Sequence, residues 1–256
     1  MIEELLQPLV SEKFLKDAHY SEGHLRIINA LPSRRVLGVH IPDIKKLARE
    51  LFKQGNSAEI IHRFGQLTST SLVYEEMLIW GFLINLQRLS LDERLELVAR
   101  FVPAMDNWAV CDTFCCNAKW MQKADKELLW SFLQPYFDSA REFEVRFAVI
   151  SAMCYLLDDE WLDRVFGRVD ALDFGRIKSE YKSVKGKPKT VQEGSVQGAA
   201  PYYVRMGVAW LLATALAKFP ERTREYARHS NLPADVIKMY VRKARESFRT
   251  RTTDAL

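Results

Sequence analysis

A succession of helical segments is the feature that most constrains how this chain can fold. In 42–55, Ile44 and Leu47 recur at the spacing that places them on one helix face. Pro42 stands at a favourable first-turn position, and Gly55 follows as a stop signal. Further helical segments, of about 10 to 20 residues with short connections, are predicted at 57–67, 71–89, 90–103, 107–123, 125–137, 141–157, 159–169, 201–219, 221–230 and 234–249.

The spacing of these segments indicates paired helices. A pair that recurs every ~35 to 45 residues is typical of an α-solenoid, in which each pair buries its apolar face against the next. Ser90 and Glu93 form a capping-box pair ahead of one segment, and no β-alternation with hairpin turns is evident. We therefore predict an all-α fold: a HEAT-like α-solenoid of paired antiparallel helices with a concave basic face, formed by a single domain over residues 1–256.

Residues 178–200 interrupt the helical pattern. This segment contains glycine, serine, lysine and proline, with little apolar content. Such a composition predicts a long, flexible basic insertion rather than a packed element. Two interpretations stay open: the insertion contacts a phosphate backbone, or it has no function.

The N-terminal segment, the distribution of apolar residues and the cysteines argue against several classes of protein. Residues 1–14 are predicted to form an acidic amphipathic helix, which has neither the basic nor the apolar region of a secretory signal. The chain contains no run of about 18 apolar residues that would cross a membrane. The four cysteines fit neither a secreted disulfide framework nor a zinc site, and we interpret them as small buried side chains: Cys111, Cys115, Cys116 and Cys154. We expect a soluble cytoplasmic protein without a metal.

Positive charge is concentrated towards the C-terminus. The net charge of the chain is +4. Residues 175–197 carry +4 and residues 236–251 carry +5, so the rest of the chain carries −5. A cationic part on an otherwise acidic body favours a polyanionic partner, although a solvated basic face without a partner would show the same pattern.

Trp108 and Asp112 are the first candidates for chemistry. They are four residues apart and therefore lie one turn apart on one helix face, with Asp106 or Asn107 as the helix cap. A carboxylate beside an indole can stabilise a developing cation, through its charge and through cation–π attraction. The alternative is a core tryptophan beside a polar residue with a purely structural role.

Arg146 and Trp210 extend this candidate set. Arg146 is a lone cation in an apolar segment, so it needs a partner if it is buried; a phosphate or Asp112 would serve. The alternative is a surface arginine whose head reaches solvent. Trp210 lies in a long apolar segment, where simple core packing is the competing interpretation.

Four motifs in order resemble the DNA alkylation repair family, the AlkD-like HEAT-repeat DNA glycosylases. They are LGVHIPDIKKLARE at 37–50, DNWAVCD at 106–112, EVRFAVI at 144–150 and YYVRMGVAWLL at 202–212, followed by KARESFR at 243–249. The resemblance covers nearly the whole chain. The insertion after Lys178 departs from it, because the family has a short connection there.

The resemblance implies a function and a set of site residues. It assigns the catalytic aspartate to Asp112, the two active-site tryptophans to Trp108 and Trp210, and the active-site arginine to Arg146. It implies hydrolysis of the N-glycosidic bond of cationic alkylated purines, such as 3-methyladenine and 7-methylguanine, in double-stranded DNA. Because the sequence shows no cofactor or metal motif, we expect neither, and a monomer is the default expectation for a repeat protein. We expect contacts with the DNA backbone from Arg205, Lys185, Lys187, Lys189, Lys238, Arg242 and Arg245. The alternative is a non-catalytic HEAT-like DNA-binding or scaffold protein.

Overall fold

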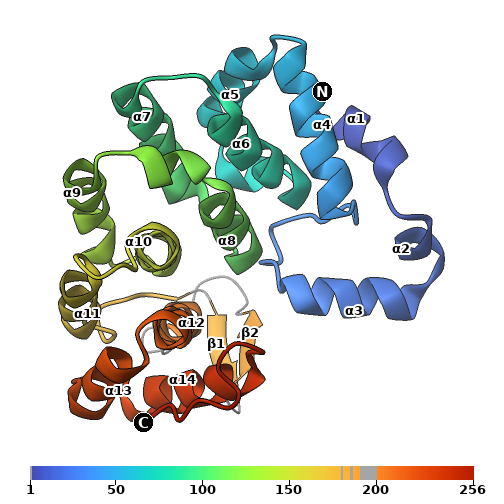
Figure 1. Cartoon of the computed structure of the whole chain (residues 1–256). Coiled ribbons are helices and arrows are strands. Elements are labelled where there is room, and N and C mark those ends of the chain that lie inside the picture. The colour runs from blue at the N-terminus through green and yellow to red at the C-terminus, as the bar shows by residue number, and fades with distance from the viewer. Residues whose placement is uncertain (1, 180, 185–186, 191–200) are drawn as a thin grey trace. The chain divides into compact units, whose positions relative to one another are not determined.

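The computed structural model describes residues 2–179, 181–184, 187–190 and 201–256, and nearly all of its elements are helices (Figure 1). The helices are α1 (Ile2–Leu6), α2 (Glu12–Lys16), α3 (Ala18–Ile28), α4 (Ile41–Lys53), α5 (Ser57–Gln66), α6 (Tyr74–Leu86), α7 (Leu91–Phe101), α8 (Trp108–Asn117), α9 (Lys126–Phe137), α10 (Glu142–Tyr155), α11 (Leu162–Asp170), α12 (Tyr202–Lys218), α13 (Pro220–His229) and α14 (Ala234–Glu246). Short 3-10 turns lie at Gln7–Leu9, Ser69–Ser71, Val102–Ala104 and Lys119–Lys123. The predicted all-α fold is confirmed.

Contacts divide the described residues into two compact units. Of the described residues, the first unit covers 2–124 and 190, and the second covers 125–179, 181–184, 187–189 and 201–256. A single repeat domain over the whole chain stays a prediction, as does the concave basic face. Each unit is therefore described by itself.

In the first unit, α6 lies between α4 and α8, and α5 and α7 pack against it (Figure 1). The sequence explains this central place, because α6 is apolar on all sides and is buried from Tyr74 to Ile84. By contrast, α5 and α7 are amphipathic and bury one face only, as outer helices do. The predicted capping box of Ser90 and Glu93 begins α7.

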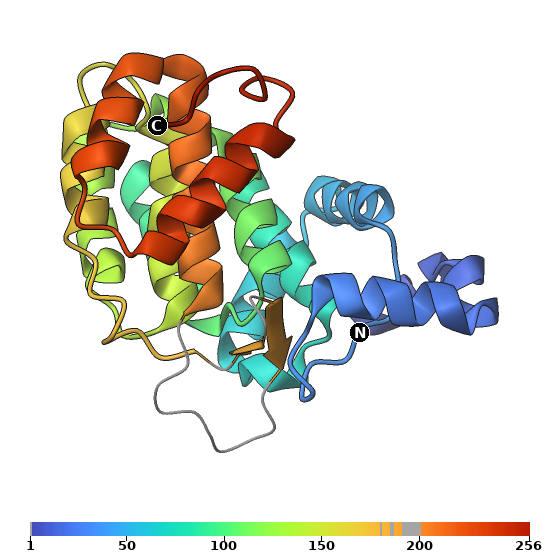
Figure 2. The same ribbon diagram turned by 90° about the horizontal axis from the view of Figure 1, so that it is seen from below.

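The second unit repeats this arrangement. Helix α12 packs against α10 and α14, while α9 packs on α10 and α13 packs on α12. Figure 2 shows α14 running obliquely across α12. Helices α10 and α12 are mostly apolar and buried along most of their length, whereas α11 and α13 are amphipathic. Alternation of buried and amphipathic helices is the two-layered pairing expected of HEAT-like repeats.

A buried carboxylate fixes the chain ahead of α4. Glu75 of α6 accepts hydrogen bonds from the backbone N–H groups of Leu37, Gly38 and Val39, at 2.8–3.3 Å. Gly38 has a φ of +91°, and a Cβ there would lie 2.3 Å from the ring of Phe14. The backbone of residues 37–39 therefore turns closely around the side chain of Glu75. Burial raises the pKa of Glu75, even though the hydrogen bonds from these N–H groups act to lower it.

The N-terminal segment corrects one prediction. The helix expected over 1–14 is broken into α1, a 3-10 turn and α2. Pro8 explains the break, because proline lacks an N–H group and its ring obstructs the preceding helical turn. Val10 instead forms an antiparallel bridge with Val39. Helix α3 had no strong sequence pattern; Asp17 caps it and Asn29, with a φ of 51°, ends it.

The insertion contains secondary structure where the sequence predicts a loop. Residues Tyr181–Val184 and Lys187–Thr190 form β1 and β2 of a two-stranded sheet. Before it, the N–H group of Lys178 donates to the carbonyl of Ala140 at 2.7 Å. Strands of four residues are too short for a clear alternating pattern, which is why the sequence did not reveal them.

The cysteines follow the prediction only in part. Cys111 and Cys115 are buried, as expected, whereas Cys154 is partly exposed and Cys116 is exposed. Cys116 lies on the outer side of α8 relative to its buried neighbours, which explains the difference. Of the helices among the described residues, none is long and apolar enough to cross a membrane.

Candidate active site

Helix α8 begins at a cap that is tied to two distant segments. The side chain of Asn107 accepts from the N–H group of Ala109 at 2.8 Å and donates to the carbonyl of Ile28 at 2.9 Å. Asp106 pairs with the buried Arg34, with an Nη2–Oδ2 distance of 2.7 Å. Of the two caps that the sequence allows, Asn107 is the cap, and Asp106 anchors the turn before it.

Trp108 is held in place by the end of α3. Its indole Nε1 donates to the carbonyl of Ile28 at 3.0 Å, with Ile27 at 3.3 Å. The ring is neither fully buried nor fully exposed. Trp108 is therefore anchored through its polar edge and is not part of the fully buried core.

Asp112 lies one turn after Trp108 on the same helix, as its spacing predicts. Its residue is 9% exposed, although the rest of α8 is largely apolar. At the end of α8, Lys45 of α4 donates to the side chain of Asn117 at 2.6 Å. The sequence analysis missed Lys45, which adds a cation beside the helix that carries Asp112.

Arg146 is buried in the second unit. It lies on α10 with 3% of its surface exposed, which excludes the surface-arginine interpretation. Its guanidinium donates to the carbonyl of Tyr203, at the start of α12. Gly207 makes room for it, because a Cβ there would lie 3.3 Å from Nη1 of Arg146.

The buried carboxylate of Glu142 binds the same residue as Arg146, Tyr203. It accepts from the N–H group of Tyr203 at 2.7 Å and from the hydroxyl of Ser179. Burial raises the pKa of Glu142 to about 7, against the lowering effects of its hydrogen bonds and of Arg146. The sequence offers only a weak signal for it, an acidic residue in the first turn of an otherwise apolar helix.

Trp210 lies on a partly exposed stripe of α12. Met206, Trp210 and Thr214 are partly exposed at four-residue spacing, while most of the residues between them are buried. Trp210 therefore does not belong to the fully buried core of its unit.

The residues predicted to bind DNA divide into three groups. Lys238, Arg242 and Arg245 are exposed on one face of α14. Arg205 is instead engaged by Asp235 in an ion pair and lies 5.7 Å from the ring centre of Phe174. The others belong to the insertion: Lys187 and Lys189 stand in β2, and Lys185 lies outside the described residues.

The four predicted active-site residues fall into two pairs. Trp108 and Asp112 share α8 in the first unit, whereas Arg146 and Trp210 stand on α10 and α12 in the second. Assembly of the four into one site stays a prediction. Among the residues that the structure describes, no three histidine, cysteine or acidic side chains cluster as metal ligands would.

Comparison with protein families found one match. The sequence pattern of the family described as DNA alkylation repair enzyme matches residues 6–172. This stretch includes Trp108, Asp112 and Arg146 and ends before Trp210. Neither the curated proteins nor the solved structures with which the chain was compared gave a match.

Proposed function

Since the chain belongs to the DNA alkylation repair enzyme family, we propose that it is a DNA glycosylase that removes cationic alkylated purines from double-stranded DNA. The family assignment gives the chain an enzymatic role in DNA repair, with DNA as its partner. The proposal adds the reaction, hydrolysis of the N-glycosidic bond, and the substrates, of the 3-methyladenine and 7-methylguanine type. It further holds that the protein acts as a monomer without a cofactor.

The pairing of Trp108 and Asp112 on α8 is the observation that carries this proposal. A cationic base leaves with the electron pair of the C1′–N bond, so positive charge develops on the deoxyribose as in other glycoside hydrolyses. Asp112 stabilises that charge and orients the water whose oxygen bonds to C1′. Trp108, fixed by the carbonyl of Ile28, presents its ring to the sugar.

The second pair supports the same reaction. Trp210 offers a partly exposed ring for stacking against the backbone at the lesion. Arg146, fixed by Tyr203, holds a nearby phosphate or orients Asp112. Because the substrate base already carries positive charge, we propose that lesion charge and duplex distortion, rather than an enclosed base pocket, select the substrate.

A non-catalytic DNA-binding protein is the second candidate. The exposed cations on α14 favour DNA binding by themselves, with or without chemistry. The two candidates differ in one respect: a binding protein does not require a carboxylate beside a fixed indole on α8. Activity therefore discriminates between them.

The experiment that tests the proposal is release of methylated purines from duplex DNA treated with a methylating agent. The full chain is incubated with the DNA, and free bases are separated and quantified against a sample without protein. Release above spontaneous depurination supports the glycosylase. Release at background by a protein that retains DNA affinity moves the assignment to the binding protein.

The exposed face of α14 yields a prediction on salt dependence. Lys238→Gln is expected to reduce the slope of log affinity against log salt concentration by about one, since one phosphate contact is lost. The measurement is fluorescence anisotropy with a duplex oligonucleotide at several salt concentrations. Arg228→Gln is the matched control, an exposed cation of α13 in the same unit. An unchanged slope in Lys238→Gln would remove α14 from the DNA interface.

A further inference from the structure

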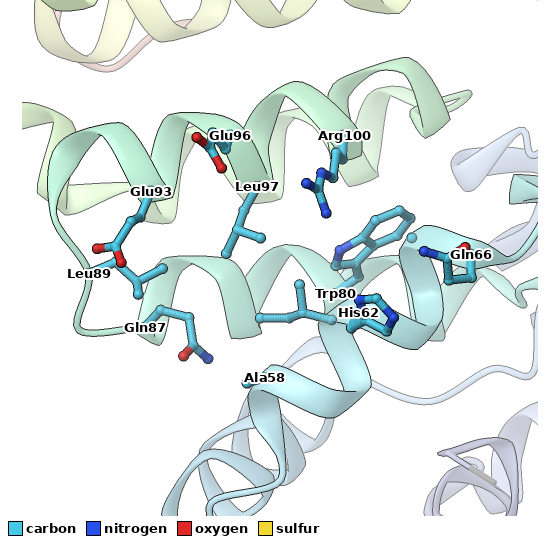
Figure 3. A pocket seen from close by; sticks show the side chains of 12 residues that line it. Ala58, His62, Gln66, Trp80, Gln87, Leu89, Glu93, Glu96, Leu97 and Arg100 are labelled. Atoms are coloured by element: carbon cyan, nitrogen blue, oxygen red, sulfur yellow. The ribbon is translucent and has the colours of Figure 1, made fainter.

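The first unit contains a pocket that the proposed reaction does not use. It lies between α5, α6 and α7 and has a volume of about 620 Å³ (Figure 3). It is lined by Ala58, Ile61, His62, Gly65, Gln66, Trp80, Gln87, Leu89, Glu93, Glu96, Leu97 and Arg100. A pocket of this size accommodates a small organic molecule or a short peptide.

Trp80 gives the pocket an unsatisfied donor. The side chain is 3% exposed, and its indole Nε1 is buried without a hydrogen-bond partner among the described residues. Buried N–H groups are nearly always paired, because an unpaired one costs about 1–3 kcal/mol. An acceptor supplied by a ligand would satisfy it.

Arg100 and His62 place further donors at the same end. In Figure 3 the guanidinium of Arg100 points towards the indole of Trp80, and His62 lies below it. Arg100 is exposed, and Glu96 precedes it by one turn of α7. The long, exposed side chain of Arg100 can change rotamer to admit an anionic acceptor to the indole.

Glu93 lies at the end of the pocket opposite Arg100, and Leu97 lies between them (Figure 3). Four residues of α7 line the pocket: Glu93, Glu96, Leu97 and Arg100. A hydrogen bond from Ser90 lowers the pKa of Glu93, so this carboxylate stays ionised. Arg100 stands seven positions after Glu93, a rise of about 10 Å along the helix. An extended chain of three residues spans about the same length.

We propose that this pocket binds a short zwitterionic peptide of about three residues. Its carboxylate lies at Arg100 and accepts from the indole of Trp80, and its ammonium group lies at Glu93 and Glu96. An apolar central side chain packs against Leu97. This site is separate from the residues assigned to base removal.

The test uses the tripeptide Ala-Leu-Ala and the full-length protein labelled with ¹⁵N. The Trp80 indole signal is assigned by its loss in Trp80→Phe and followed during titration. We expect a saturable shift with the free tripeptide, and binding weaker by about tenfold when its C-terminus is amidated, because a charge-assisted hydrogen bond is lost. N-acetylation is expected to weaken binding as well.

Arg100→Gln provides the decisive variant, since its exposed position makes it compatible with folding even if Trp80→Phe is not. Affinity for the free tripeptide is expected to fall by about tenfold, while the amidated peptide is unaffected. Arg63→Gln, an exposed cation of α5 that does not line the pocket, is the matched control. The proposal is overturned by the absence of a saturable shift up to about 10 mM, or by equal binding of the free and amidated peptides.

Discussion

Asp112→Asn is expected to lower the rate of methylated-purine release by about 10²–10³, the size of effect that removal of one preorganised electrostatic group has in other enzymes. The substitution keeps the shape of the side chain but removes the negative charge that, in the proposed mechanism, stabilises the developing oxocarbenium ion. Asp112 is nearly buried, so its charge acts there with little screening by solvent. The measurement is single-turnover release of methylated purines by wild type and variant, corrected for spontaneous depurination.

Two controls separate chemistry from folding and binding in this experiment. Asp92→Asn alters an exposed acidic residue of α7 in the same unit and is expected to leave release unchanged. DNA affinity and the melting temperature of Asp112→Asn show whether binding and fold are retained. Wild-type rates of purine release by a folded Asp112→Asn protein would contradict the assignment of Asp112 as the catalytic aspartate.

Much of the fold could be predicted because helices are local structures. The apolar faces of α4 and α5, the capping box ahead of α7 and the stop at Gly55 all depend on residues within a few positions of one another. The failures are also physical. Pro8 was read as part of a continuous helix, and β1 and β2 are too short to show a period.

In the candidate site, too, only the local part could be predicted from the sequence. Trp108 and Asp112 share a helix, so four-residue spacing is sufficient to place them together. What holds the site residues is not local: the carbonyl of Ile28 lies 80 residues from Trp108, and that of Tyr203 lies 57 residues from Arg146. Backbone carbonyls carry no sequence signature, so only the structure reveals these supports.

Glu142 also makes contacts with residues distant in the sequence, and these contacts lead to a prediction about stability. Glu142→Ala leaves the N–H group of Tyr203 and the hydroxyl of Ser179 without their buried acceptor. Each unsatisfied buried group costs about 1–3 kcal/mol, so we expect the loss of two acceptor contacts to lower the free energy of unfolding by about 2–6 kcal/mol. Glu142→Gln retains one acceptor oxygen and is expected to be much less destabilising near pH 5.

The free energies of unfolding of wild type and Glu142→Gln are expected to diverge as the pH rises. Because the pKa of Glu142 is raised from 4.5 to about 7, the folded state binds a proton that the unfolded chain releases between these values. The contribution of this group to stability is therefore complete below pH 4.5 and falls until about pH 7. Glutamine does not ionise, so wild type should lose on the order of 2–3 kcal/mol relative to Glu142→Gln between pH 5 and 8.

Urea unfolding of both proteins at pH 5, 6, 7 and 8 measures this divergence. Glu93→Gln serves as the control, since a hydrogen bond from Ser90 lowers the pKa of Glu93 and places its titration below this range. Its stability should therefore run parallel to that of wild type. If the stability of Glu142→Gln also follows that of wild type at every pH, Glu142 titrates at the same pH in the folded and unfolded chains. Burial would then not determine the pKa of this carboxylate. Divergence in the expected direction would mean that the network joining α10 to the start of α12, through Arg146 and Tyr203, contains a carboxyl group that is protonated in part of the population at neutral pH.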